Sequence, residues 1–279
     1  MKGFLKKNLE ANKMEIPGEE LPKGWLAPEE DALVPPRKLW IGPKDSISHY
    51  YRWIWEYLAY LTLLCNLKRD HSVLELGCGH GRTARGLLSY LRYPGLYIGL
   101  DVNKEMIEDA KQRIEARWPN FRFIYASIYS RNYNSDAQNN AASYVFPFKP
   151  ESFDVIYAAS LFTHLLPDET LNYFIQSNRV LRKGGKCLFS FFILDYYMGP
   201  GTTISPAYEF ESKFENYDGV RIKDPKNPDN LIGYSLKTIM DYASRSGFEV
   251  KRVIPGLWSE KQMYCVNEQD LVVLIKKYK

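Results

Sequence analysis

The first 44 residues show no sustained hydrophobic periodicity. They contain six prolines, which disfavour a long helix or a central strand. The segment either wraps the rest of the chain or stays mobile, and Trp25 and Trp40 favour docking because disordered tails seldom carry such residues. We predict an N-terminal arm over residues 1–44.

From residue 47 onward, apolar residues recur first at helical spacing and then in short runs. Apolar runs predict strands at 72–76, 96–101, 121–126, 152–159, 186–194, 248–254 and 270–276. Helical spacing predicts helices at 47–67, 82–92, 104–117, 168–182 and 235–247. Strands that alternate with helices indicate βαβ units and a parallel sheet. No helix separates the last two strands, which predicts one antiparallel strand.

Two connections are too long for simple turns, residues 129–149 and 196–232. Loops over the carboxyl ends of parallel strands are where a ligand lid would lie. A chain of 279 residues with 45% apolar content is long enough for one large core. We therefore expect one domain over residues 45–279, with a lid-like insertion at 196–232.

Composition narrows the classes of partner. The chain has 37 Lys and Arg against 33 Asp and Glu, so it gives little support for a nucleic-acid partner, which usually needs a concentrated basic face. The four cysteines include no CxxC pair, and we expect no metal site. The N-terminus lacks the apolar core of a signal peptide, and the apolar stretch 53–67 is too short to span a bilayer. These features predict a soluble, cytoplasmic protein.

The strongest motif is the glycine-rich segment Val73–Gly81, which follows a strand and opens a helix. Its spacing is GxGxG, whereas a nicotinamide-dinucleotide fingerprint would need glycine where Arg82 stands. No Gly-Lys-Ser/Thr follows, which excludes a P-loop. Taken alone, such a segment is also compatible with an ordinary tight turn.

Two carboxylates accompany these glycines. Glu75 precedes them, and an acidic group there would repel a pyrophosphate but suits a ligand with ammonium and sulfonium groups. Asp101 ends the second strand, where a carboxylate can accept both hydroxyl hydrogens of a ribose. Alternatively, Asp101 only caps the helix that follows Asn103. The combination of glycines, Glu75 and Asp101 favours the ligand interpretation.

Over residues 45–279 the chain resembles the class I S-adenosylmethionine-dependent methyltransferases. The resemblance rests on residues 73–81, 97–102, 153–156 and 179–185, which match the family's first motif, second motif, fourth strand and the turn before the fifth strand. It implies a doubly wound α/β fold whose mostly parallel seven-stranded sheet has the order 3-2-1-4-5-7-6, with helices on both faces. It also implies S-adenosylmethionine as cofactor, with Glu75 and the glycines at its methionine part and Asp101 at its ribose.

The expected cofactor-binding residues are Glu75, Gly77, Cys78, Gly79, Gly81, Asp101, Val102, Ser127, Ile128 and Ser160. The chain departs from the family at Ser127, where similar enzymes often carry an acidic residue that contacts the adenine. It also lacks the Asn/Asp-Pro-Pro-Tyr signature of many amino-directed nucleic-acid methyltransferases, which disfavours methylation of DNA or RNA bases.

Methyl transfer to a neutral hydroxyl requires a base. His164 follows the fourth strand and Asp195 the fifth, and we treat both as candidates. Alternatively, His164 bonds to the backbone and Asp195 is an ordinary turn residue. Phe162, Tyr196 and Tyr197 are candidates for an acceptor pocket, or they only pin long loops to the body.

The sequence therefore predicts a methyltransferase that acts on a small molecule or glycan, at oxygen. A methyltransferase for a protein side chain or RNA is the alternative, and a groove with basic rim residues would favour it over an enclosed aromatic pocket. A non-catalytic cofactor-binding protein and an oxidoreductase of the same fold also remain open.

Overall fold

The computed structural model describes residues 31–40, 47–199, 201–203, 208–210, 212–259 and 267–277, with the backbone alone for residues 47–49. Residues 1–30 of the expected N-terminal arm lie outside the described residues. Within its described part, Trp40 and Leu39 are buried, and Trp40 stacks on Tyr50 at 5.3 Å between ring centroids. This part of the segment therefore packs against the body of the molecule.

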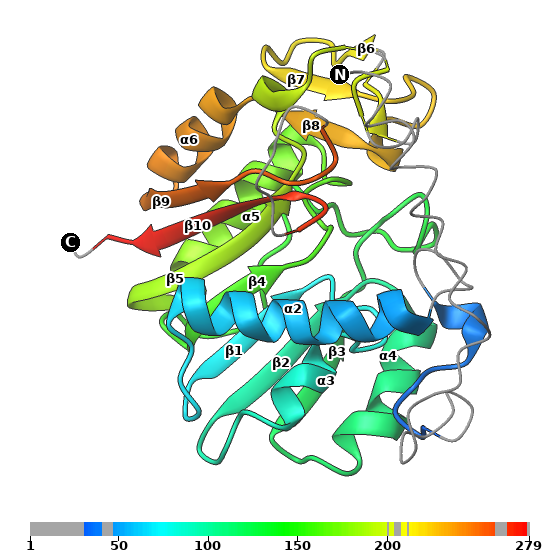
Figure 1. Ribbon diagram of the computed structural model, residues 1–279, viewed down its shortest axis with the longest axis vertical. Helices are drawn as coiled ribbons and strands as arrows, with labels where there is room; N and C mark the ends of the chain where they lie inside the picture. Colours follow the sequence, from blue (N-terminus) through cyan, green and yellow to red (C-terminus); the bar gives the residue numbers. More distant parts are fainter. Residues whose placement is uncertain are drawn as a thin grey trace, which may run out of the picture.

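A seven-stranded sheet forms the centre of the molecule (Figure 1), in the order β3-β2-β1-β4-β5-β10-β9. Its strands are β1 Ser72–Leu76, β2 Leu96–Asp101, β3 Phe121–Tyr125, β4 Phe153–Ala158, β5 Leu181–Phe191, β9 Phe248–Ile254 and β10 Asp270–Lys276. β10 pairs antiparallel with β5 and β9, and the other pairings are parallel. Numbered along the chain without the short strands between β5 and β9, this is the predicted order 3-2-1-4-5-7-6.

Helices cover both faces of this sheet because the strand side chains alternate. Val73 and Tyr157 belong to a core that also contains Tyr57 of α2, whereas Leu74 and Phe189 belong to the core on the other face. The longer helices are α2 Ile47–Cys65, α3 Ala84–Leu88, α4 Lys104–Ala110, α5 Pro167–Val180 and α6 Leu236–Arg245. A π-helical turn, η2 Lys111–Glu115, extends α4. Among the described residues, no helix has the length and apolar character to cross a membrane.

α3 is shorter than the predicted helix 82–92, since residues 82–83 and 89–90 form turns. At its start the Thr83 hydroxyl donates to Glu75 inside the protein, and Arg82 stacks over the Trp53 ring at 4.2 Å. α6 is capped by Ser235, whose hydroxyl accepts from the Thr238 N–H at 3.2 Å.

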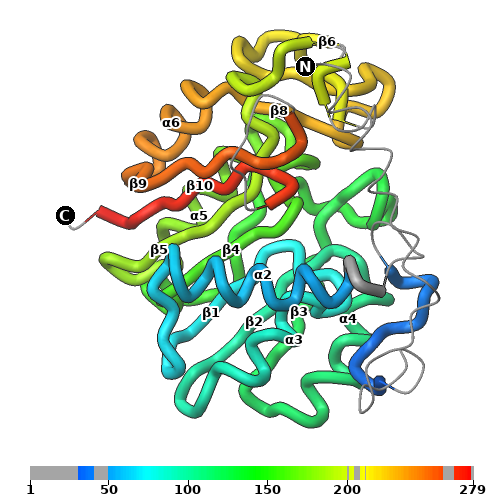
Figure 2. The backbone as a smooth tube through the Cα atoms, in the orientation of Figure 1, coloured from blue at the N-terminus to red at the C-terminus, as the bar shows by residue number. Residues whose placement is uncertain are grey.

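The long connection after β5 forms a small three-stranded antiparallel sheet. Its strands are β6 Ser212–Lys213, β7 Val220–Ile222 and β8 Ile232–Tyr234. This sheet lies beyond the end of β5 (Figures 1 and 2). It is joined to the central body, because the Ile232 N–H donates to the Thr163 carbonyl at 2.8 Å and Tyr234 is fully buried. The part of the segment that contains β8 is therefore core structure.

Candidate functional site

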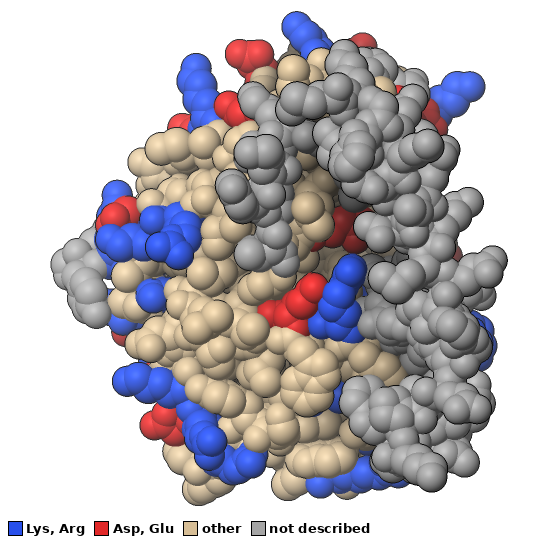
Figure 3. Space-filling model, viewed as in Figure 1, with Lys and Arg blue, Asp and Glu red and all other residues tan. Residues whose placement is uncertain are grey.

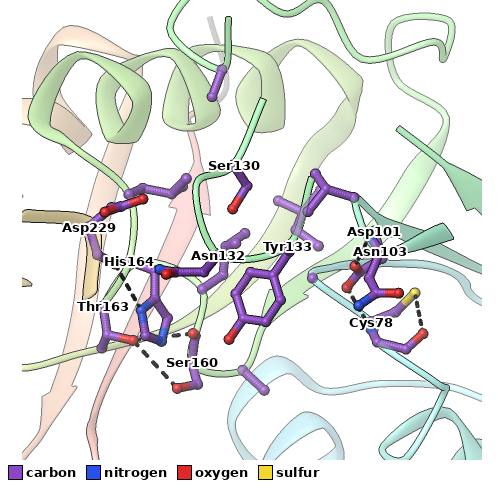
Figure 4. A pocket seen from close by; sticks show the side chains of 18 of the residues that line it. Cys78, Asp101, Asn103, Ser130, Asn132, Tyr133, Ser160, Thr163, His164 and Asp229 are labelled. Carbon is purple, nitrogen blue, oxygen red and sulfur yellow. Dashed lines mark hydrogen bonds between the residues drawn. The ribbon is translucent and has the colours of Figure 1, made fainter. Parts of the chain in front are cut away.

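A cavity of about 460 Å³ opens at the carboxyl ends of β1, β2 and β4 (Figure 4). Several segments of the chain form its wall. They are Trp53 of α2, the glycine loop after β1, the end of β2 with the start of α4, the loop after β3, the turn from β4 into α5, the insertion after β5 and the residues just before β10. Volumes of this size are usual for small-molecule sites. The parallel order of β1, β2 and β4 brings these segments together at one edge of the sheet.

The glycine loop turns sharply under the cavity. Gly77 has φ of +74°, a conformation that side chains of other residues rarely adopt, and its N–H donates to the Leu100 carbonyl at 2.8 Å. The next residues, Cys78 and Gly79, also line the cavity. The loop is thus tied to the end of β2, and its backbone forms part of the cavity wall.

Asp101 lies in the same wall. Its contacts bear on both interpretations made from the sequence, a contact with the ribose and a cap for the following helix. One carboxylate oxygen accepts from the Gly79 N–H and the other from the Asn103 N–H, both at 2.7 Å. Burial raises the pKa of this carboxyl, and the backbone N–H groups oppose the shift. Asp101 therefore fixes the glycine loop and the start of α4, while it also lines the cavity.

Glu75 occupies a different position from Asp101. It is only 2% exposed, and its carboxylate accepts from the hydroxyls of Thr83, Tyr97 and Tyr157, the last two at 2.5 and 2.7 Å. Burial raises its pKa to about 7, against the effect of these donors. Glu75 contributes to the cavity wall, and its three hydroxyl donors also tie the start of α3 to β1, β2 and β4.

Two of the expected cofactor residues lie elsewhere. Gly81 does not line the cavity; a Cβ on it would come within 2.9 Å of Ile114 and 3.0 Å of Phe123, so its role is close packing. Ser127 is exposed and outside the wall, because its carbonyl faces the loop after β3 and accepts from Asn139 at 2.6 Å. Neither residue lines the cavity, and their contact with a cofactor stays a prediction.

Three other expected residues, Val102, Ile128 and Ser160, do line the cavity. Ser160 has φ of +62°, a strained conformation for a residue with a side chain. Its N–H donates to the Ser190 hydroxyl at 2.7 Å, and its own hydroxyl accepts from the Gln269 amide at 2.8 Å. Backbone strain of this kind concentrates at functional sites.

His164 lines the cavity close to Ser160 (Figure 4). Its Nδ1 lies 3.1 Å from the Asp229 carbonyl oxygen. A carbonyl can only accept, so Nδ1 carries the hydrogen and, in the neutral ring, Nε2 keeps a free lone pair. Burial lowers the pKa of His164, which favours this neutral form at neutral pH. The histidine thus bonds to backbone, with Asp229 and Asn230 both contributing to its environment, and it also lines the cavity.

Asp195 does not share this position. Its carboxylate accepts from the Leu236 N–H at 2.7 Å, at the first residue of α6. It lines a separate surface hollow beside Gly219 and Ser235. The two candidate bases are therefore not equivalent, and Asp195 is a helix-capping residue outside the cavity.

The three aromatic candidates for an acceptor pocket also lie outside the cavity wall. Phe162 is fully buried and packs on Phe189 and Phe191 in the core. Tyr197 stacks on Trp258, and Tyr196 packs beside the same aromatic cluster. Tyr196 and Tyr197 thus pack the segment after β5 onto the body, whereas Phe162 is part of the core, and a contact of these residues with an acceptor stays a prediction.

Other aromatic residues line the cavity instead: Trp53, Tyr129, Tyr133, Tyr173, Phe192 and Tyr208. Residues 129–133 come from the loop after β3, whose unusual length was the only signal in the sequence. Arg131 of this loop donates to the Lys226 carbonyl at 2.9 Å and lies 3.8 Å from Asp229 of the insertion. The two long connections therefore meet over the cavity.

The charges of the wall test which cofactor suits it. Among the described residues that line it, five are acidic, Glu75, Asp101, Glu169, Asp229 and Glu268, and two are arginines, Arg82 and Arg131. Five negative against two positive groups leaves a formal excess of three negative charges when all are ionised. S-adenosylmethionine carries sulfonium and ammonium groups, which this wall attracts, whereas the pyrophosphate of a dinucleotide would be repelled. The residues present fit the sulfonium cofactor.

Part of the chain is similar to known methyltransferases. Residues 74–189 match the family model described as a methyltransferase domain. A putative methyltransferase of Mycobacterium tuberculosis, Rv1506c, is 34% identical over 101 residues. This match covers 35% of the present chain and 55% of the relative, so the chain spans about half the length of that curated protein.

Solved structures share the fold at low sequence identity. An S-adenosylmethionine-dependent methyltransferase from Methanosarcina mazei aligns with a TM-score of 0.52 and 18% identity, over 76% of this chain and 95% of that one. The PH0226 protein of Pyrococcus horikoshii aligns with a TM-score of 0.57 and 19% identity, over 84% and 93%. A methyltransferase from Clostridium acetobutylicum gives 0.53 and 15%, over 82% and 92%. Residues 74–189 thus match a methyltransferase domain, and the chain shares the fold of these solved structures.

Proposed function

We propose that the protein transfers the methyl group of S-adenosylmethionine to an oxygen atom of a small molecule or glycan, with His164 as the base. The observation that carries this proposal is the position of His164. It lines the same cavity as Gly77, Gly79 and Asp101, and its Nδ1–H bond to the Asp229 carbonyl leaves Nε2 free to accept a proton.

Different residues of the wall would bind the cofactor and the acceptor. The glycine loop and Asp101 would hold the cofactor, and Val102 and Ile128 would surround its adenine ring. When bound, this cofactor supplies a methyl group already activated on a sulfonium. The acceptor hydroxyl would form the new C–O bond and give its proton to His164 Nε2, while the electrons of the broken C–S bond remain on sulfur. The protein aligns the acceptor and excludes water.

The shape and charge of the site support a small acceptor over a protein side chain or RNA. Two connections meet over the cavity, and six aromatic residues lie in its wall. Outside it, Lys and Arg side chains lie mainly toward the edges of the described part of the face in Figure 3. A macromolecular nucleic-acid ligand would call for a gathered basic surface.

The test replaces His164 by Gln. We expect turnover to fall by about 100-fold or more, since this is the usual contribution of a general base. S-adenosylhomocysteine should still bind in calorimetry, and NAD should not. Because burial lowers the pKa of His164, wild-type activity should rise with pH through a midpoint below the usual histidine value of ~6.5 and then stay level.

The matched control is His71→Gln, because His71 precedes β1 at the opposite end of the sheet and does not line the cavity. It should leave both the rate and the pH profile unchanged. Normal turnover of His164→Gln at neutral pH would contradict a base at this position. Tight binding of NAD without any response to S-adenosylhomocysteine would contradict the proposed activity altogether.

A further inference from the structure

The cavity has two ends, which Figure 4 shows on either side of Tyr133. Cys78, Asp101 and Asn103 lie at one end, where the cofactor would bind. Ser160, His164 and Asp229 lie at the other end, which we call the acceptor half. Four further lining residues belong to it by contact: Gln269 donates to the Ser160 hydroxyl, its neighbour Glu268 accepts from Tyr208, and Phe192 packs on Tyr208. Glu169, which lines the wall as well, lies within the electrostatic field of Asp229.

Hydrogen-bond donors of the acceptor half are already bound to the protein. His164 Nδ1–H donates to the Asp229 carbonyl at 3.1 Å, and the Gln269 amide N–H donates to the Ser160 hydroxyl at 2.8 Å. The Tyr208 hydroxyl donates to the Glu268 carboxylate. A ligand in this half therefore meets few free hydrogens.

Some hydrogen-bond acceptor atoms of the same half, in contrast, have no hydrogen-bond partner among the described residues. Gln269 Oε1 and Asp229 Oδ1 are buried and have no hydrogen-bond partner among the described residues. His164 Nε2 keeps its lone pair. Buried polar atoms are nearly always satisfied in folded proteins, so these oxygens point to a ligand that brings several hydrogen-bond donors.

Charge limits the class of that ligand further. Asp229, Glu268 and Glu169 place three carboxylates in this part of the wall. Arg131 Nε lies 3.8 Å from Asp229 Oδ1, beyond hydrogen-bond distance, and Arg82 is stacked on Trp53. Both arginines keep their positive charge, but the carboxylates outnumber them. A phosphate or carboxylate group would be repelled here. The rings of Phe192 and Tyr208 add flat apolar surface, on which the face of a sugar ring can pack.

We propose that the methyl acceptor is an uncharged molecule with several hydroxyl groups, such as a sugar or polyol. Its hydroxyls would donate to Asp229, Glu268 and Gln269, and the hydroxyl beside His164 would be the one methylated. This inference rests on the proposed oxygen methylation and makes it more specific.

The experiment separates a small-molecule cell extract by ion exchange into neutral, anionic and cationic fractions. Each fraction is incubated with the full-length protein and S-adenosylmethionine carrying a labelled methyl group. We expect the label in the neutral fraction, and we expect periodate treatment of that fraction to remove its acceptor activity, because periodate cleaves vicinal diols. In a binding assay with S-adenosylhomocysteine present, neutral methyl hexosides should bind more tightly than the matching uronic acids and hexose phosphates.

Asp229→Asn keeps the size of the side chain and removes its charge. It should lower labelling of the neutral fraction by roughly tenfold, the usual effect of losing a hydrogen bond to a charged group, with the affinity for S-adenosylhomocysteine unchanged. The difference in affinity between neutral hexosides and uronic acids should also become smaller. Asp224→Asn is the matched control, because Asp224 lies in the same segment but outside the cavity wall.

Label in the anionic or cationic fraction would overturn the acceptor class while leaving methyl transfer intact. The cationic result would indicate an amine acceptor, for which no base is required. Absence of label in every fraction, with S-adenosylhomocysteine still bound, would contradict the proposed function itself and the acceptor assignment with it. An equal response to Asp229→Asn and Asp224→Asn would show that Asp229 has no part in recognition.

Discussion

Asp101 shows how one residue serves both the fold and the ligand. Its two oxygens accept from the Gly79 and Asn103 N–H groups, and it lies in the cavity wall. Asp101→Asn replaces one acceptor oxygen by an amide that cannot accept. We expect cofactor affinity to fall roughly tenfold or more, the effect of a lost charged hydrogen bond, measured by calorimetry.

The melting temperature of Asp101→Asn should also fall, because one backbone N–H loses its partner. Asp109→Asn is the control, since Asp109 pairs with Arg113 on α4 away from the cavity. An unchanged dissociation constant together with a lower melting temperature would show that Asp101 is only a structural cap.

Glu75, unlike Asp101, is enclosed by side-chain hydroxyls of the protein. From the sequence it was a candidate ligand for the methionine part of the cofactor. The tertiary structure surrounds it with the hydroxyls of Tyr97 and Tyr157, which come from the neighbouring strands β2 and β4. Those strands are distant in sequence, so no local pattern indicates that the carboxylate is already satisfied.

At the scale of elements, the glycine loop is held against α4 and β3 by Gly81. Gly81 has φ of +81°, and an added Cβ would lie 2.9 Å from Ile114. A left-handed conformation costs a residue other than glycine roughly 1–2 kcal/mol, and the close contact adds to that. Gly81→Ala should therefore lower the free energy of unfolding by about 2 kcal/mol or more, as measured by denaturant titration.

The chain offers a matched control in Gly201, which has φ of +80° but no atom within 4 Å of an added Cβ. Gly201→Ala should show only the backbone part of the cost. If both substitutions cost the same, the packing role of Gly81 is wrong. A loss of cofactor affinity in Gly81→Ala without a loss of stability would instead restore Gly81 to the binding site.

The segment 196–232 was expected to be a lid, and this role stays a prediction. The domain boundary expected at residue 44 also stays a prediction. The structure adds that β8, which begins at the last residue of this segment, is buried against the core. Among the described residues of the segment, Tyr208, Pro228, Asp229 and Leu231 reach the cavity. A shortened segment would therefore remove core contacts as well as cavity wall, so single substitutions such as Asp229→Asn are the sharper test.

At the scale of the whole molecule, the excess of carboxylates in the wall should affect cofactor binding. S-adenosylmethionine carries one more positive charge than S-adenosylhomocysteine. Raising the salt concentration from 50 to 500 mM should weaken binding of S-adenosylmethionine by roughly threefold or more, because salt screens the attraction between the carboxylates of the wall and the cationic cofactor. The affinity for S-adenosylhomocysteine should change less.

Calorimetry at several salt concentrations measures both dissociation constants under matched conditions. Equal salt dependence for the two ligands would contradict an electrostatic contribution from the wall. Stronger binding of S-adenosylmethionine at high salt would mean that the two arginines, Arg82 and Arg131, dominate the local field.

The sequence by itself predicted the strands, the antiparallel strand and the position of the glycine loop, because hydrophobic periodicity and glycine spacing are local properties. The strand order was implied by the family resemblance. The sequence also placed Asp101 and His164 at the edge where the cavity lies, since Asp101 ends β2 and His164 lies in the turn between β4 and α5. Only the tertiary structure decided which rim residues face the cavity. Phe162 turned into the core, Asp195 capped α6 and Tyr133 entered the wall, because side-chain direction in a turn depends on packing partners that lie far away in the chain.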